Sequence, residues 1–272
     1  MNKKNNLKTK KYLGLLAHPS MLPNAIIAKY GKALSGLFKD KAFYMQGRMD
    51  MDPRSTWHKK EFAEMTGGYF PQGDGASRAL SELESWDIVR QNMLTLFLRT
   101  IVANRIEGEF AELGVYRGNT ARLMHKYAPE RKLHLFDTFE GFSERGASAE
   151  KRQTGDAVSE SQFSNTSVEG VKEFIDPNAN VTIYKGYFPD SAPSELAKRR
   201  FSFVHLDADL YEPTLAGLDY FYPKMNAGGF IIVHDYNAWS GARRATDAFF
   251  KDKKEKPVPM PDKSGSALII KQ

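Results

Sequence analysis

The sequence contains no cysteine, and this absence excludes disulfides, thiolate metal sites, iron–sulfur clusters and a cysteine nucleophile. None of its apolar runs approaches the ~20 residues that a membrane-spanning helix needs. Its 272 residues contain no internal repeat and no low-complexity block. The lack of cysteine fits a reducing compartment, so we expect a cytoplasmic protein.

Positive charge is unevenly distributed along the chain. The sequence has 39 basic and 33 acidic residues, but residues 1–41 contain nine lysines and one acid. The rest is slightly acidic, so we expect no nucleic-acid partner. Within the basic segment, apolar residues recur at helical spacing: Ile26, Tyr30, Ala33, Leu34 and Leu37. Such an amphipathic helix is able to dock on the body, on a second subunit of a homo-oligomer or, weakly, on an anionic membrane surface.

The chain divides into two parts with different patterns. Residues 1–80 join the basic segment to an irregular stretch rich in methionine and glycine, which predicts an N-terminal cap. Residues 81–272 predict one α/β domain that opens with a long helix over 81–106.

Short apolar runs alternate with helical stretches after residue 106. The predicted strands cover 109–115, 132–137, 181–185, 201–207, 229–233 and 266–271, and the predicted helices cover 120–127, 167–175, 194–200, 213–225 and 241–251. The apolar runs are continuous, as in parallel strands that are covered on both faces. The alternation predicts a doubly wound, mostly parallel, Rossmann-like α/β sheet. His134 and His205 fall inside predicted strands, where we expect satisfied core residues.

A glycine-containing turn follows the first predicted strand. Gly114 and Gly118 allow close approach of a ligand, and the following helix N-terminus favours its anionic end. Asp137 lies nineteen residues after Gly118 and ends the next strand, where a carboxylate accepts hydrogen bonds from a ribose. Glu112, before the glycines, would repel a pyrophosphate but attract an ammonium and a sulfonium. The turn also lacks the G-x-G-x-x-G pattern, so S-adenosylmethionine is favoured over a nicotinamide cofactor.

Four segments occur in a fixed order between residues 107 and 250: FAELGVYRGNTARL, LFDTFEGF, YKGYFPD and a run from VHLDADLYEPT to GGFIIVHDYN. Together they resemble the macrocin and mycinamicin sugar O-methyltransferase family. The resemblance implies a class I, S-adenosylmethionine-dependent enzyme, often assisted by Mg²⁺, that methylates a deoxysugar hydroxyl of a natural product. The implied partner is a hydroxylated, sugar-like small molecule. Residues 1–80 and much of 142–165 do not take part in the resemblance.

The resemblance also implies which residues bind S-adenosylmethionine. With the rest of the glycine turn, the expected set is Glu112, Gly114, Tyr116, Gly118, Asn119, Thr120, Asp137, Thr138, Phe139 and Phe188. Phe188 and its neighbour Tyr187 have an alternative role in packing against the sheet edge, and the sequence does not separate the two roles.

A divalent metal site is expected where the strands over 201–207 and 229–233 end. The resemblance implies Asp207, His234 and Asp235 as ligands, with His234 at a position where the family has an acid. Nitrogen suits Mn²⁺ better than Mg²⁺, and either ion would orient the acceptor and lower the pKa of its hydroxyl. Asp209 is either a further ligand or a turn residue.

His234 is the expected general base if no metal binds, with Asp207 or Asp235 orienting it. The family's histidine base, in the insert after the second strand, has no counterpart because residues 141–180 contain no histidine. His234 and Asp207 are therefore the candidate catalytic residues. The missing base leaves a second function class open, a catalytically degenerate scaffold that binds the cofactor without turnover.

Overall fold

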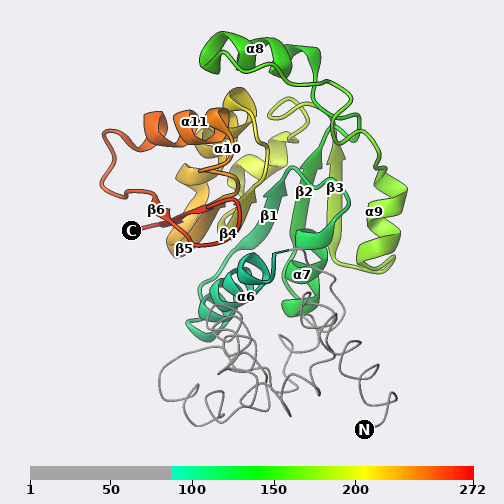
Figure 1. Cartoon of the computed structure of the whole chain (residues 1–272). Coiled ribbons are helices and arrows are strands. Elements are labelled where there is room, and N and C mark those ends of the chain that lie inside the picture. The colour runs from blue at the N-terminus through cyan, green and yellow to red at the C-terminus, as the bar shows by residue number, and fades with distance from the viewer. Residues whose placement is uncertain (1–86) are drawn as a thin grey trace, which may run out of the picture. The chain divides into compact units, whose positions relative to one another are not determined.

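The computed structural model describes residues 87–272, so the predicted basic helix, the cap and the start of the long helix lie outside the described residues. The strands are β1 (Glu109–Leu113), β2 (Leu133–Asp137), β3 (Val181–Lys185), β4 (Phe201–Leu206), β5 (Met225–Val233), β6 (Val258–Pro259) and β7 (Ala267–Ile270). They form one sheet of order β3-β2-β1-β4-β5-β7-β6 (Figure 1). The first five strands are parallel, and β7 is antiparallel to both of its neighbours. The predicted doubly wound, mostly parallel sheet is confirmed.

The described helices are α6 (Ile88–Ala103), α7 (Asn119–Tyr127), α8 (Glu144–Thr154), α9 (Val168–Ile175), α10 (Tyr211–Phe221) and α11 (Ser240–Phe250). Two 3₁₀ helices cover Ser194–Lys198 and Tyr222–Lys224, where the sequence predicted α-helix. The sequence did not predict α8, because its eleven residues carry few apolar side chains. Buried Glu150 anchors this helix by accepting a hydrogen bond of 2.7 Å from the first backbone N–H of α10.

Two hydrophobic cores cover the two faces of the sheet. One core joins α6, α7 and α9 to side chains such as Phe110, Leu135 and Phe203. The other core joins α10 and α11 to side chains such as Phe136 and Leu206. Figure 1 shows α10 and α11 grouped together, away from α6 and α7. None of the described helices is long and apolar enough to cross a membrane.

The first turn of α6 is fixed by a capping residue. Asp87 accepts a hydrogen bond from the backbone N–H of Arg90 at 3.0 Å, and it also accepts one from Lys263 N at 2.7 Å. The helix ends at Ala103, slightly earlier than predicted, because Arg105 has a φ of 52° and leaves the helical region. This N-cap hydrogen bond therefore fixes the backbone position of Arg90, from which its side chain extends.

The sheet reverses its strand order between β1 and β4. The chain moves outward through β2 and β3 on one side and through β5 on the other. In such sheets the crevice beyond the carboxyl ends of the two central strands is where ligands bind.

Candidate active site

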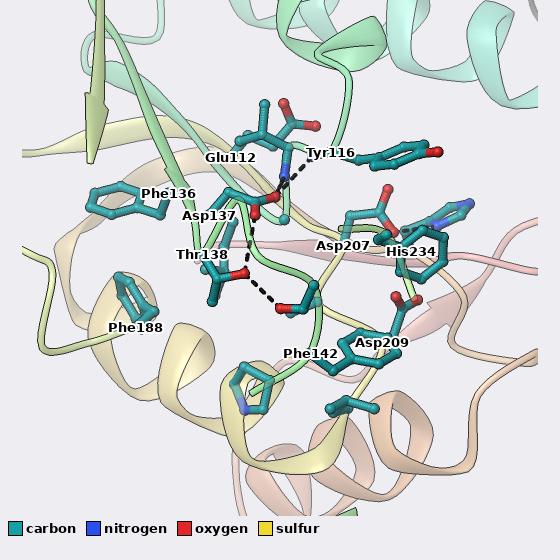
Figure 2. A pocket seen from close by; sticks show the side chains of 18 of the residues that line it. Glu112, Tyr116, Phe136, Asp137, Thr138, Phe142, Phe188, Asp207, Asp209 and His234 are labelled. Atoms are coloured by element: carbon teal, nitrogen blue, oxygen red, sulfur yellow. Dashed lines mark hydrogen bonds and ion pairs between the residues drawn. The ribbon is translucent and has the colours of Figure 1, made fainter. Parts of the chain in front are cut away.

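A cavity of about 310 Å³ lies at this crevice, between the loops that follow the parallel strands (Figure 2). Eight of the ten predicted cofactor residues line it, namely Glu112, Gly114, Tyr116, Asn119, Thr120, Asp137, Thr138 and Phe188. The structure does not bring the other two to the cavity. Gly118 precedes α7 with a φ of 83° and lies against Val171, whereas Phe139 is buried in the core.

The turn after β1 is tight, and a carboxylate from β2 supports it. Gly114 has a φ of 85°, and a Cβ atom there would overlap the backbone carbonyl of Asp207. Oδ2 of Asp137 accepts hydrogen bonds from the backbone N–H groups of Val115 and Tyr116, at 2.7 and 2.8 Å. Oδ1 accepts a third bond from the backbone of Phe139 at 2.7 Å. Oγ1 of Thr138 lies 3.5 Å from Oδ1 but donates its one proton to the carbonyl of Gly141 at 2.6 Å. Asp137 thus fixes the turn, and about one acceptor position of its carboxylate remains for a ligand.

Glu112 and His205 form a buried pair on β1 and β4. They are register partners, and Nδ1 of His205 lies 3.0 Å from Oε1 of Glu112. Because Arg90 Nη2 can only donate, Nε2 of His205, 3.2 Å away, accepts, and Nδ1–H donates to Glu112. Burial raises the pKa of the Glu112 carboxyl well above its usual range and lowers the pKa of His205. Oε2 of Glu112 is buried without a close hydrogen-bond partner among the described residues, and the backbone of Ala121 offsets only part of the rise in the pKa of this cavity-lining carboxyl group.

Arg90 links this pair to the next strand end. Its Nη2 lies 2.8 Å from Oδ2 of Asp207 and 3.3 Å from Oγ1 of Thr120. Arg90 was not among the predicted site residues, because an arginine in a long helix carries no local sign of what it will contact. His205 was correctly predicted to be a satisfied core residue, but its link between Glu112 and Arg90 was not.

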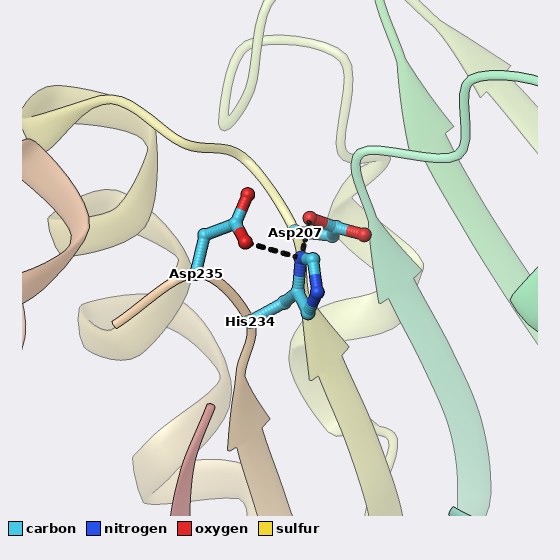
Figure 3. A group of neighbouring side chains, drawn as sticks. All are labelled: Asp207, His234 and Asp235. Atoms are coloured by element: carbon cyan, nitrogen blue, oxygen red, sulfur yellow. Dashed lines mark hydrogen bonds and ion pairs between the residues drawn. The ribbon is translucent and has the colours of Figure 1, made fainter. Parts of the chain in front are cut away.

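The predicted ligands Asp207, His234 and Asp235 do converge, and one ligand atom from each lies within 4.8 Å of the others (Figure 3). Nδ1 of His234 is 2.7 Å from Oδ1 of Asp207 and 3.3 Å from Oδ1 of Asp235. Burial raises the pKa of Asp207, but His234 and Arg90 outweigh this effect and lower it. Burial lowers the pKa of His234, and the carboxylate of Asp207 more than reverses this and raises it. The pair therefore favours a carboxylate beside an imidazole whose Nδ1 carries a proton.

Asp209 lies beside this group, and its backbone conformation is strained. Asp209 and Asp235 have backbone φ values of 58° and 56°, a region that residues other than glycine rarely occupy. Burial and the nearby Asp207 and Asp235 raise the pKa of Asp209. Its backbone carbonyl also accepts the N–H of Ala242 at 3.0 Å, which ties the loop after β4 to α11.

Aromatic residues form two walls of the cavity. Phe188 packs on Phe136 and Phe221, at centroid distances of 5.2 and 5.6 Å, and it also lines the cavity, so its packing role is observed and its cofactor contact stays a prediction. Figure 2 shows Phe136 and Phe188 on one side of the pocket, with Asp207 and His234 on the other. Tyr187 lines the same region, and burial beside Glu212 raises the pKa of its hydroxyl to about 12.

The second wall comes from loops whose contribution the sequence analysis did not identify. Phe163 contacts Tyr116 and Phe142 edge-on, at centroid distances of 5.3 and 5.5 Å, and all three line the cavity. Phe142 and Phe163 belong to the stretch 142–165, which has no repeating pattern that would have revealed their convergence.

Comparison with known sequences gives one family. Residues 88–267 match the Macrocin-O-methyltransferase (TylF) family. The demethyldecarbamoylnovobiocin O-methyltransferase of Streptomyces niveus is 24% identical over 246 residues, which cover 84% of this chain and 91% of that enzyme. The 8-demethyl-8-(2,3-dimethoxy-alpha-L-rhamnosyl)-tetracenomycin-C 4'-O-methyltransferase of Streptomyces olivaceus is 27% identical over 157 residues, which cover 54% of this chain and 60% of that enzyme. The mycinamicin III 3''-O-methyltransferase of Micromonospora griseorubida is 26% identical, over 54% of this chain and 62% of that enzyme.

Solved structures show the same fold. The O-methyltransferase NovP superposes with a TM-score of 0.60 at 23% identity, over 68% of this chain and 80% of its own. The calicheamicin methyltransferase CalS11 superposes with a TM-score of 0.57 at 16% identity, over 99% of this chain and 93% of its own.

Proposed function

The chain belongs to the macrocin O-methyltransferase family, and we propose that it transfers a methyl group from S-adenosylmethionine to a hydroxyl of a sugar-like small molecule. The observation that carries this proposal is the cavity at the switch point, where an unpaired acceptor of Glu112 lies next to the Gly114 turn. A buried acceptor without a donor is costly, so a cationic ligand that supplies one fits this place.

The residues present fit the cofactor. Oε2 of Glu112 suits its ammonium, and the remaining acceptor position of Asp137 suits a ribose hydroxyl. Thr138 and Phe188 line the part of the cavity that we propose for the adenine base of the cofactor. When bound, S-adenosylmethionine supplies an electrophilic methyl group on a sulfonium. The chain's own part is to orient the two reactants and to receive the acceptor's proton.

His234 is the residue that we propose to receive this proton. In the neutral ring, Nδ1–H is donated to Oδ1 of Asp207 and Nε2 keeps its lone pair. Because Asp207 raises the pKa of His234, this neutral form predominates only above the raised pKa. Asp207 would keep the ring in this tautomer and orientation. As the acceptor oxygen gains the methyl group, its O–H bond breaks and the proton passes to Nε2.

Of the two expected ions, Mg²⁺ fits this donor set poorly, and the positive charge of Arg90 disfavours either ion. The three side chains are close enough together, but one is an imidazole where the family has an acid, and Mg²⁺ prefers oxygen. Asp207 is also paired with Arg90. The proposed reaction therefore has no step that depends on a metal.

The sugar-like acceptor is proposed from the relatives and from the aromatic wall. The matched enzyme of Streptomyces olivaceus carries a rhamnosyl group in its substrate name. In this chain Tyr116, Phe142 and Phe163 form an aromatic surface beside the reactive groups, which suits the apolar face of a deoxysugar.

The proposal is tested by calorimetry with S-adenosylhomocysteine, followed by transfer of a labelled methyl group to a panel of deoxysugar glycosides. We expect His234→Asn to lower kcat by about 10²- to 10⁴-fold with little change in cofactor affinity. His125→Asn is the matched control, because this buried histidine of α7 does not line the cavity. Binding without turnover of any acceptor would favour the scaffold function, and no binding would overturn the proposal.

A further inference from the structure

Arg90 places a permanent positive charge beside the three predicted metal ligands. Its Nη2 lies 2.8 Å from Oδ2 of Asp207, and the two side chains are only 21% and 23% exposed. A guanidinium does not lose its proton in proteins. Asp207 therefore already has a cationic partner, and this partner belongs to the chain.

Both oxygens of Asp207 and Nδ1 of His234 are already in use, whereas Oδ1 of Asp235 has no hydrogen-bond partner among the described residues. Oδ2 of Asp207 is paired with Arg90, and Oδ1 accepts the N–H of His234 at 2.7 Å. An ion at this site would have to displace the proton on Nδ1 and approach a fixed guanidinium at the same carboxylate. The charge balance is also unfavourable, because His234 removes one negative charge relative to a three-acid site and Arg90 adds a positive one.

We propose that Arg90 takes the place of the divalent cation, so that this chain works without a bound metal ion. The guanidinium fixes one oxygen of Asp207, which leaves the other oxygen directed at Nδ1 of His234. Arg90 is thus a positioning residue, since it acts on the acceptor through Asp207 and His234. Its contacts with His205 and Thr120 fix its own orientation from two further elements.

This inference rests on the proposed methyl transfer, so its test measures metal binding as well as activity. Mn²⁺ binding to the full chain is measured by electron paramagnetic resonance up to about 1 mM free ion, the weak end of the range for divalent cations held by oxygen ligands. We expect no saturable binding that depends on Asp207, and no change in methyl transfer after treatment with EDTA. Saturable Mn²⁺ binding to the wild-type chain that is lost in Asp207→Asn would overturn the inference. A chain that binds no S-adenosylhomocysteine would instead refute the proposed function.

Variants of Arg90 separate a cation substitute from a merely structural residue. Arg90→Gln removes the charge, and combining it with His234→Asp restores a site of three acids. We expect the double variant to bind Mn²⁺ at least about tenfold more tightly than His234→Asp alone. Arg90→Lys with His234→Asp keeps the positive charge and should resemble His234→Asp. Equal Mn²⁺ affinity in all three would overturn the role of Arg90. If Arg90→Gln fails to fold, the wild-type Mn²⁺ and EDTA measurements still decide whether the chain works without a bound metal ion.

Discussion

Oε1 of Glu112 on β1 lies 3.0 Å from Nδ1 of His205 on the neighbouring strand β4, and Glu112 lines the cavity proposed for the cofactor. His205 satisfies one oxygen of the carboxyl group, and the other oxygen has no partner among the described residues. Because burial raises the pKa of Glu112, its carboxyl group binds a proton more readily in the folded chain without ligand than in water. A cationic ligand at this place would favour the ionised form.

Cofactor binding should therefore release a proton from Glu112. The affinity for S-adenosylhomocysteine should rise with pH, by up to about tenfold per unit while the pH is below the raised pKa of Glu112, and level off above it. Calorimetry in buffers of different ionisation enthalpy would measure both the affinity and the proton release. Glu112→Gln should bind more weakly at high pH and lose this pH dependence. Glu109→Gln is the matched control, since Glu109 lies on β1 like Glu112 and pairs with His134 of β2, but does not line the cavity. Equal wild-type affinity across the range would contradict the prediction.

Gly114 should tolerate no side chain. Gly114→Ala meets both an unfavourable φ of 85° and an overlap with backbone, whereas Gly155→Ala meets a φ of 87° with nothing within 4 Å. We expect Gly155→Ala to lower the free energy of unfolding by about 1–2 kcal/mol, and Gly114→Ala to lower it by more and to weaken cofactor binding. Urea denaturation of the two variants would check this. Similar losses in both would mean that the backbone contact at Gly114 has little effect on stability.

Asp137 should matter both for the turn and for the ribose. Asp137→Asn replaces a carboxylate that accepts three backbone N–H groups, and we expect a loss of about 2–4 kcal/mol in cofactor affinity, roughly 30- to 1000-fold. To isolate the ribose contact, S-adenosylhomocysteine is compared with its 2'-deoxy and 3'-deoxy analogues by calorimetry. One of the two analogues should bind the wild-type chain more weakly than S-adenosylhomocysteine does. In Asp137→Asn the same analogue and S-adenosylhomocysteine should bind equally well. Losses that are the same in both proteins would assign Asp137 to the turn alone.

Glu255 should make the fold sensitive to acid, far from the cavity. Its carboxylate accepts hydrogen bonds from Tyr222 Oη at 2.6 Å and from Lys271 Nζ at 3.2 Å. The bond from Tyr222, the largest cause, helps to lower the pKa of Glu255 to about 2. Because the folded pKa lies below the unfolded value of about 4.3, this stabilisation is complete above that value and is lost as the pH falls toward 2. Between these pH values the wild-type chain should lose more unfolding free energy than Glu255→Gln. Parallel curves would contradict this.

Much of the fold was determined by local sequence patterns. Continuous apolar runs separated by helical periodicity are enough to indicate parallel strands with helices on both faces. Parallel strands end at one edge, so residues that follow the strands, such as Gly114, Asp137, Asp207 and His234, could be expected to meet there. For this reason eight of the ten predicted cofactor residues line the cavity. The 3₁₀ helices and α8 were mistaken or missed because short polar segments carry little periodicity.

Only the tertiary structure decided how these residues are paired. Arg90 and Asp207 are 117 positions apart, and their contact depends on how α6 packs against β4. The bond between Glu112 and His205 depends on the register of β1 and β4, because a shift of one residue would turn one of the two side chains to the other face. The convergence of Phe142 and Phe163 depends on two irregular loops. Local patterns show which side chains a strand delivers to the edge of the sheet, whereas charge pairing there is set by packing between distant segments.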